Sequence, residues 1–349
     1  MTAELIPAER LAAFAAAALV ANGLPEADAR TIADLMIEAD LLGADGHGIF
    51  RLPRYLARLQ AGGFARDAEI RVVRRKGGTA LVDGGNGFGH LVMARAGDLV
   101  QELASAHGIG WVGTRMSNHA GAAGVHTLRL AERGFIGIYL AVGNANHMAP
   151  WGGRELLLST NPISIAIPAR NGPVLLDMAT TVAAYGKVKL AADRGEMMPE
   201  GWMIDAEGRP LLDPARADGG SLLPIGGPKG SGLSLMFGLL AGTLNGAALG
   251  RDVIDFNADA SSPTNTGQAI VALDISCFAD PAEFAGRVDS IRTEIRTSAP
   301  RPGFDSVRLP GERSLAERER RRRGGIPVPQ PLLRRLDTIA QACRIAPLI

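Results

Sequence analysis

Residues 115–168 alternate glycine-rich turns with apolar runs, and this pattern predicts strands and helices in turn. A strand over residues 109–114 precedes a turn that carries His119, and an amphipathic helix follows that turn. Residues 135–142 form a nearly unbroken apolar run, which suits a strand buried on both faces, and the turn-rich GNANHMAPWGG leads to a further strand. Because both loops can reach one cleft, we expect the chemistry there.

Composition limits the class of protein and its partners. The chain has 349 residues, of which 46% are hydrophobic, so it can bury a sizeable core. Its 37 Lys and Arg nearly balance its 36 Asp and Glu, which argues against nucleic acid or an anionic membrane surface and favours small-molecule partners. The two cysteines, Cys277 and Cys343, cannot form a disulfide framework or a cysteine-based zinc site, so a cytoplasmic protein is expected.

The pattern of the first 63 residues predicts three helices, over residues 7–21, 26–42 and 50–61. The apolar run inside the first of them is about half of the ~20 residues that span a bilayer, so no membrane segment is expected. His47, between two glycines, and Arg51 lie where the third helix begins. An arginine at that place can bind a carboxylate or a phosphate, but it can equally be a surface charge, and His47 can simply cap a helix.

The sequence contains no Rossmann fingerprint in a suitable context. A hairpin over residues 70–83 and a helix over residues 91–106 precede the single GxGxxG match, formed by Gly108, Gly110 and Gly113. This match follows a helix and opens a strand, whereas a Rossmann phosphate loop follows a strand and opens a helix. Gly108 is better explained as a helix C-terminal cap, so any dinucleotide must be held by another element.

Later segments supply further candidates. Asp177 lies at the C-terminal end of a predicted strand, where ligands commonly bind in α/β sheets. It can also have the structural role of capping a helix N-terminus. In GGPKG (residues 226–230), glycines and Lys229 open an apolar helix that we expect to be buried, and this is a good anion site; otherwise Lys229 points into solvent. The basic run at residues 318–323 is interpreted as a solvated helix face.

Seven blocks in order make the chain similar to a known family: DGHGIFRLPRYLARLQAGG, RMSNHAGAAG, MAPWGGRELLLSTNPISIAIP, LLDMATTVAAYGKVKLA, LLPIGGPKGSGLSLM, NTGQ and LPGE. They resemble the malate/L-lactate dehydrogenase type 2 family of NAD(P)-dependent oxidoreductases. The resemblance implies a non-Rossmann α/β fold with a mixed sheet flanked by helices, and a homodimer that holds NAD or NADP between domains. We expect an N-terminal helical unit, 1–80, packed with segment 300–349, and a cofactor-binding and catalytic α/β domain, 81–299.

The resemblance also assigns roles to residues. His119 is expected as the general acid/base, with His47 and Arg51 lining the substrate site. The expected cofactor contacts are Asn144, Asp177, Met178, Ala179, Pro228 and Lys229. The chain departs from the family where Ser231 replaces a tyrosine and where GNANHM replaces an NSPP-like loop, which bears on the contacts of Asn144 and on the pocket near Ser231. The histidines at positions 90, 107, 126 and 147 are interpreted as structural.

The expected reaction is reversible hydride transfer between the nicotinamide C4 and the C2 carbon of a small 2-oxo acid or its imine counterpart. Arg51 would fix the carboxylate, and His119, with a pKa near neutrality, would exchange the proton. Two alternatives stay open: metal-dependent hydrolysis by His47, His119 and His147 with Asp177, and a non-catalytic relative that binds nucleotide. No HxxxH or HExxH spacing supports the hydrolase.

Overall fold

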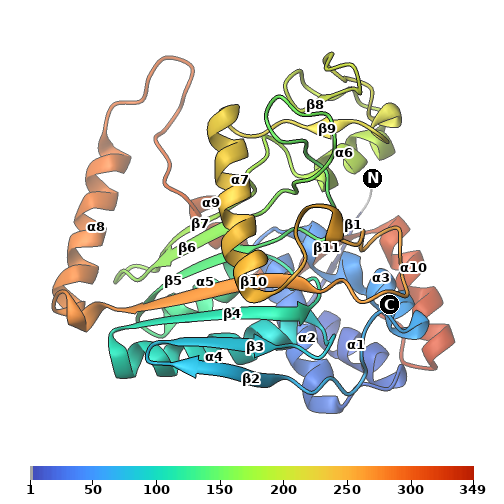
Figure 1. Cartoon of the computed structure of the whole chain (residues 1–349), viewed down its shortest axis with the longest axis horizontal. Coiled ribbons are helices and arrows are strands. Elements are labelled where there is room, and N and C mark those ends of the chain that lie inside the picture. The colour runs from blue at the N-terminus through green and yellow to red at the C-terminus, as the bar shows by residue number, and fades with distance from the viewer. Residues whose placement is uncertain (1–2) are drawn as a thin grey trace.

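The fold is built on a seven-stranded mixed sheet (Figure 1). The computed structural model describes residues 3–349, apart from the side chains of Leu190, Asp193 and Arg194. The strand order is β2-β3-β4-β10-β5-β6-β7, in which β3 and β4 are parallel and all other neighbours are antiparallel. The strands are β2 (Arg71–Lys76), β3 (Thr79–Asp83), β4 (Ile109–Ser117), β5 (Phe135–Ala141), β6 (Ile163–Ile167), β7 (Val174–Met178) and β10 (Thr266–Asp274).

The middle strand, β10, shows why the sheet needs helices on both faces. Its first seven residues are buried, and its side chains alternate between two cores, as the pleat requires. Ile270 and Ala272 join a core with α4 (Gly89–His107), and Ala269 joins a core below α7 (Pro228–Ala241) on the other face. Together with α5 (Ala123–Glu132), which lies beside α4, these helices confirm the predicted mixed sheet flanked by helices.

The GxGxxG match is a helix end, as predicted. Gly108 caps the C-terminus of α4 with φ 80°, a left-handed conformation that favours glycine, and β4 begins at the next residue. Gly113 lies inside β4, against the side chain of Asn245, and has no place in a phosphate loop.

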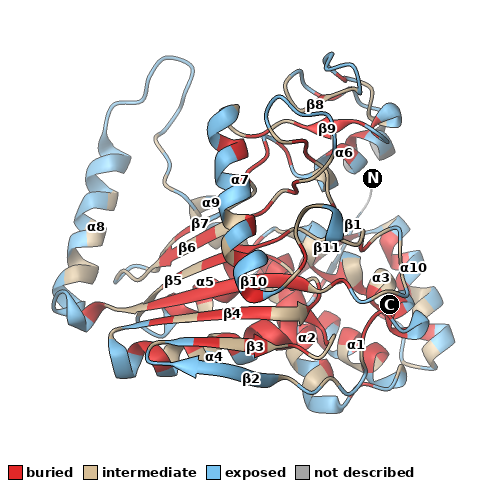
Figure 2. Cartoon of the chain, viewed as in Figure 1, coloured by how far each residue is buried: buried red, intermediate tan, exposed pale blue. Residues whose placement is uncertain are grey.

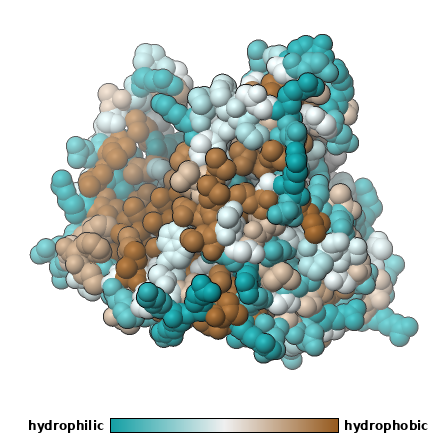
Figure 3. Space-filling view, viewed as in Figure 1, coloured by the Kyte–Doolittle hydropathy of each residue, from teal (hydrophilic) through white to brown (hydrophobic). Residues whose placement is uncertain are grey.

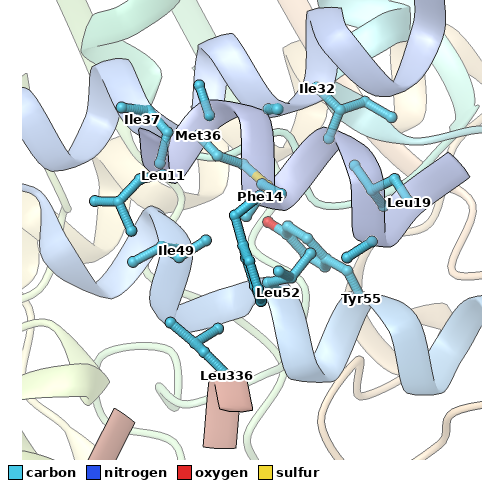
Figure 4. Packing of buried hydrophobic residues seen from close by; sticks show 14 of the residues in the cluster. Leu11, Phe14, Leu19, Ile32, Met36, Ile37, Ile49, Leu52, Tyr55 and Leu336 are labelled. Atoms are coloured by element: carbon cyan, nitrogen blue, oxygen red, sulfur yellow. The ribbon is translucent and has the colours of Figure 1, made fainter. Parts of the chain in front are cut away.

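Helices from both ends of the chain form one apolar core (Figure 4). They are α1 (Ala8–Ala21), α2 (Glu26–Leu41), α3 (Leu52–Ala61) and α10 (Gln330–Cys343), and β1 (Ala3–Ile6) pairs with β11 (Ile326–Pro329) beside them. Leu11, Leu52 and Leu336 meet in this core, so residues near both termini pack together. Strands β2 and β3 belong to the sheet; the division at residue 80 stays a prediction.

Residues 182–223 form a small lobe with an apolar core of its own (Figure 1). It contains α6 (Tyr185–Arg194), β8 (Met203–Ile204) and β9 (Ser221–Leu222), and a bridge between Thr181 and Pro224 closes its base. On the other side of the molecule, α8 (Pro281–Thr297) projects from the sheet, and α9 (Glu312–Gly324) follows. Single 3₁₀ turns lie at Pro214–Arg216, Thr243–Asn245, Gly250–Asp252 and Ile275–Cys277. Within residues 3–349 we find no helix whose length and apolarity would let it span a membrane.

Two predictions about exposure were wrong. Helix α7 is not buried throughout, because Leu233, Met236 and Leu239 lie on its open side, where apolar side chains gather on the surface (Figures 2 and 3). The basic run in α9 is not only a solvated face, because Arg318 pairs with Glu38 and Glu132, and Arg321 is buried between α9 and the start of the loop after α2. The buried arginines dock α9 on α2, a long-range arrangement that charge alone does not predict.

Candidate active site

The loop between α2 and α3 carries two of the predicted site residues, His47 and Arg51, on consecutive 3₁₀ turns, Asp45–His47 and Ile49–Arg51. The carboxyl of Asp40, inside α2, accepts a hydrogen bond of 2.7 Å from the amide of Ile49, and burial raises the pKa of Asp40 to about 8. A Cβ on Gly48 would lie 2.0 Å from this carboxyl, so only glycine fits there. The buried carboxyl of Asp40 therefore holds the loop in place.

His119 lies just after β4, with its ring held on one side and open on the other. Its Nδ1 is 2.6 Å from the Tyr55 hydroxyl and also receives the amide N–H of Gly121 at 3.3 Å. Because the Tyr55 hydroxyl can donate or accept, Nδ1 can accept from it, which leaves the ring proton on Nε2, or can donate its own proton to it, which leaves Nε2 as an acceptor. His119 remains partly exposed, so Nε2 is the end that can meet a substrate.

A second histidine stacks on the first. The rings of His47 and His119 are parallel, with centroids 5.3 Å apart and planes at 7°. Burial, followed by the charge of Arg51, lowers the pKa of His47 to about 4. The pKa of His119 is held well below 6.5 by burial first, then by Arg51, His47 and His90. The expectation of a pKa near neutrality was therefore wrong for the free protein: at pH 7 the imidazole is neutral and can accept a proton.

Arg51 is half-buried rather than a surface charge. Its Nε donates to the Gly46 carbonyl at 2.7 Å, and one terminal nitrogen lies 3.5 Å from the Asn257 side-chain oxygen. Among the described residues no carboxylate forms an ion pair with it. Its guanidinium charge acts on His47, His119 and His147, so an uncompensated cation faces the histidines. Such a site suits a small anion with a reacting atom next to its carboxylate.

Residues 255–257 form a further side of the site. The Phe256 ring lies 5.7 Å from the His119 ring, and Asn257 reaches Arg51. Arg54 and the fully buried Arg58, both on α3, donate to backbone carbonyls of this segment, and the Arg58 guanidinium also covers the Phe256 ring at 4.5 Å. The helix that follows Arg51 thus holds the segment in place.

Sequence reasoning missed several of these residues. Tyr55, four positions after Arg51, was expected on the same side of α3 but was given no role in the site. Phe256 and Asn257 had no usable signal, since they reach the site from a turn-rich segment about 200 residues away. Arg58 was also hidden, because a buried arginine bound to carbonyls has the same sequence signature as an exposed one.

The predicted cofactor segments are neighbours in space. The amide of Ile225 donates to the Thr180 carbonyl at 2.9 Å, which places the turn before Pro228 and Lys229 beside the segment of Asp177, Met178 and Ala179. Pro228 and Lys229 are exposed at the start of α7. Asp177 is exposed too, and its Oδ2 accepts the Gly124 amide at 2.7 Å, so it caps α5 rather than a helix of its own segment.

The two departures from the family pattern have structural uses here. Asn144 donates from its side chain to the Thr266 hydroxyl at 2.7 Å, and its carbonyl receives the Phe256 amide at 2.8 Å. The Ser231 hydroxyl accepts the Trp151 amide at 2.9 Å and is buried, so it fixes the MAPWGG turn against α7. Asn144 thus ties its loop to the segment that touches His119.

The hydrolase alternative finds no support in this geometry. His47 and His119 stack, but Asp177 is engaged with α5 and His147 stacks on Tyr185. Within the described part of the chain no cluster of three or more His, Cys, Asp or Glu side chains is arranged to hold a metal ion. The structural interpretation of His126 fits its contacts, since it is buried, stacks on Tyr139 and bonds to the Ala120 carbonyl.

The fold and the site define an α/β protein without a Rossmann unit, in which an arginine acts on a neutral histidine. The family described as malate/L-lactate dehydrogenase matches residues 6–337, so the chain belongs to this family, as the sequence blocks predicted. A malate dehydrogenase of Pyrococcus abyssi is 39% identical over 344 residues, covering 96% of this chain and 94% of the relative. An L-sulfolactate dehydrogenase of Methanothermobacter thermautotrophicus is 39% identical over 323 residues, covering 93% and 92%.

More distant relatives and solved structures agree. A ureidoglycolate dehydrogenase (NAD(+)) of Escherichia coli is 32% identical over 291 residues, covering 83% of this chain and 82% of the relative. The structure of malate dehydrogenase from Pyrococcus horikoshii has a TM-score of 0.91 at 34% identity and covers 99% of this chain and 97% of that one. A delta1-piperideine-2-carboxylate reductase from Pseudomonas syringae has a TM-score of 0.85 at 30% identity, covering 97% and 100%. The predicted non-Rossmann fold of the family is therefore confirmed.

Proposed function

We propose that this protein reversibly transfers a hydride between NAD(P)H and the C2 carbon of a small 2-oxo acid or its cyclic-imine counterpart. Family membership and relatives named as dehydrogenases and a reductase support this class of reaction. The observation that carries the proposal is the pairing of a neutral His119, held by Tyr55, with the unpaired Arg51 beside it.

The chain's own residues fit a dinucleotide. Gly226 and Gly227 have φ of 59° and 63°, a left-handed conformation that lets a ligand approach the backbone, and they lead into the N-terminus of the 14-residue helix α7. Lys229 adds an exposed positive charge there, and Asp177 lies on the neighbouring segment. We infer that Pro228, Lys229 and the segment 177–179, with Asn144 nearby, hold the cofactor, which supplies the hydride when it is bound.

Arg51 binds the substrate carboxylate in a bidentate manner, and this orients C2 and its oxygen toward His119. In oxidation, Nε2 of His119 accepts the hydroxyl proton as the hydride leaves C2 for the cofactor, in the tautomer whose ring proton lies on Nδ1 and is donated to the Tyr55 oxygen. In reduction, His119 returns a proton to the carbonyl oxygen as C2 gains the hydride. The bound carboxylate offsets the Arg51 charge, one cause of the low His119 pKa, so substrate binding favours uptake of the proton that reduction needs. His47 stacks on one face of the His119 ring.

Tyr55 acts as a positioning residue for His119. In Tyr55→Phe, we expect kcat to fall about tenfold while the KM for the 2-oxo acid stays unchanged, because the ring keeps its aromatic packing and only the bond to Nδ1 is lost. Steady-state kinetics in both directions checks this. A rise in KM with kcat unchanged would instead place Tyr55 in substrate binding.

Lys229 should contribute to cofactor affinity. In Lys229→Met, we expect the Kd for NADH and NADPH to rise roughly tenfold, since one charge-assisted hydrogen bond of about 1.5 kcal/mol is lost, and we expect the effect to shrink at high salt. Lys187→Met, at another exposed lysine, is the matched control. The affinities are measured by calorimetric titration. If the variant binds both cofactors as tightly as the wild type, the cofactor does not bind at this turn.

We further propose a cytoplasmic homodimer with the two-part division at residue 80. The free thiols of Cys277 and Cys343 fit a reducing compartment. The exposed apolar side of α7, with Leu233, Met236 and Leu239, fits a contact with a second copy of the chain, because apolar surface of this kind is usually covered.

A screen tests the proposed reaction. Purified protein is mixed with NADH or NADPH and a panel of 2-oxo acids and cyclic imine acids, and cofactor oxidation is followed by absorbance. Turnover with at least one acid and one cofactor is the expected result. Tight cofactor binding without any turnover would support the non-catalytic alternative instead.

A further inference from the structure

His147 lies where the lobe meets the sheet, and the proposed reaction gives it no role. Its backbone is fixed on both sides: its amide donates to the Leu158 carbonyl at 3.1 Å, and its carbonyl receives the Leu222 amide at 2.8 Å. Its ring stacks on Tyr185, with centroids 4.1 Å apart and planes at 6°. The imidazole therefore has a defined position and plane.

His147 lies on the loop that is joined to the segment 255–257, which contacts Arg51 and His119. The charges of Asp255, Lys189 and Arg51 act on His147, in falling order, and Asp255 lies in the segment that reaches the site. In that segment Phe256 packs on His119 and Asn257 reaches Arg51. The Phe256 amide also bonds to Asn144, three residues before His147. The segment 255–257 thus contacts His119 and Arg51 and is bonded to the loop that carries His147.

The ring of His147 has hydrogen-bonding capacity that the fold does not use. In the part of the chain that the structure describes, neither ring nitrogen has a hydrogen-bond partner, and the residue is only half-buried. Burial, the largest cause, lowers its pKa to about 4, so at pH 7 it is a neutral imidazole with one N–H donor. His126 differs, because its Nε2 is bonded to the Ala120 carbonyl.

We propose that His147 is a specificity-determining residue, whose ring N–H donates to an oxygen at the end of the substrate opposite to the carboxylate on Arg51. This inference rests on the proposed function. The substrate class is a 2-oxo acid, or the matching 2-hydroxy acid, whose far end carries a carboxylate or amide oxygen. Stacking on Tyr185 holds the imidazole plane, so the His147 N–H has a fixed direction. A substrate whose far end is apolar leaves this N–H without a hydrogen-bond partner, which disfavours its binding.

The variant His147→Phe tests this, because phenylalanine keeps an aromatic ring on Tyr185 but removes the N–H. The kcat/KM values of the wild type and the variant are measured for oxaloacetate and 2-oxosuccinamate, which end in a carboxylate and an amide, and for pyruvate and 2-oxobutyrate, which end in methyl groups. We expect the ratio of kcat/KM for either polar acid to that for 2-oxobutyrate to fall about tenfold. The rate with pyruvate should stay within about twofold. His107→Phe, at an exposed histidine, is the matched control.

Each other outcome overturns the inference. An unchanged ratio, or an equal loss with all four acids, would make His147 a structural residue. A wild-type protein that turns over only the acids ending in methyl groups would also contradict the substrate class. Failure of the reaction itself is distinguishable, because then the wild type oxidises neither NADH nor NADPH with any acid, whereas an active wild type with an unchanged ratio refutes only the role of His147.

Discussion

The variant His119→Ala is expected to lose about 10²–10⁴ of kcat while it binds NADH or NADPH as tightly as the wild type. The loss follows from the removal of the imidazole proposed as the general acid/base, whose Nδ1 is bonded to Tyr55 and Gly121. Added imidazole should restore part of the rate, since the deleted ring leaves a space beside His47. Single-turnover measurement at saturating cofactor checks the loss of the chemical step directly.

The matched control for this variant is His107→Ala, because His107 is exposed at the end of α4. His119→Ala also leaves the buried Tyr55 hydroxyl unpaired, which costs about 1–3 kcal/mol of unfolding free energy, so thermal unfolding should be recorded beside activity. A folded His119→Ala protein with a near wild-type kcat would remove His119 from the chemistry.

The second large effect is expected in Arg51→Lys. The kcat/KM for 2-oxo acids should fall roughly tenfold to a hundredfold, because an ammonium group cannot reproduce the planar pair of hydrogen bonds that holds a carboxylate, worth about 1.5–3 kcal/mol. Cofactor affinity should not change, since the predicted cofactor segments lie on other elements. Kinetics with varied acid at saturating cofactor gives the value.

Arg30→Lys is the control for this substitution, as Arg30 forms an exposed ion pair with Asp34. An additional signature is expected in the histidines. Since Arg51 lowers the pKa of His119 from nearby, moving its charge should change the acid limb of the pH profile. If neither kcat/KM nor the pH profile changes, Arg51 does not bind the substrate carboxylate.

Local patterns predicted much of the fold. Short sequence patterns were enough to predict three features that the structure contains. They are the helix end at Gly108, the apolar strand β5 and the alanine-rich first helix. The exposed side of α7 was not predicted, because a helix that is apolar all round gives no indication of which face stays uncovered. The docking of Arg321 against Asp45 also has no local signal, since the two are 276 residues apart.

The sequence predicted those site residues that are chemically suited to the reaction and also lie in a family block. His47, Arg51 and His119 meet in space, as their family blocks implied. The electrostatics were not predictable, because the low pKa of His119 depends on burial and on the charges of Arg51, His47 and His90, whose distances no sequence shows. Phe256 reaches His119 and Asn144 through contacts that span more than 100 residues.

The central claim is direct transfer of a hydride from the cofactor to C2 of an acid held by Arg51 beside His119. The most direct measurement uses NADH or NADPH carrying deuterium at C4 and detects the product by mass spectrometry. The account predicts a 2-hydroxy acid, or a cyclic amino acid from an imine, with one deuterium at C2 when the labelled face of the nicotinamide is the reacting one; both C4 epimers are therefore used. A product without deuterium from either epimer, or no product from any acid of the panel, would contradict it.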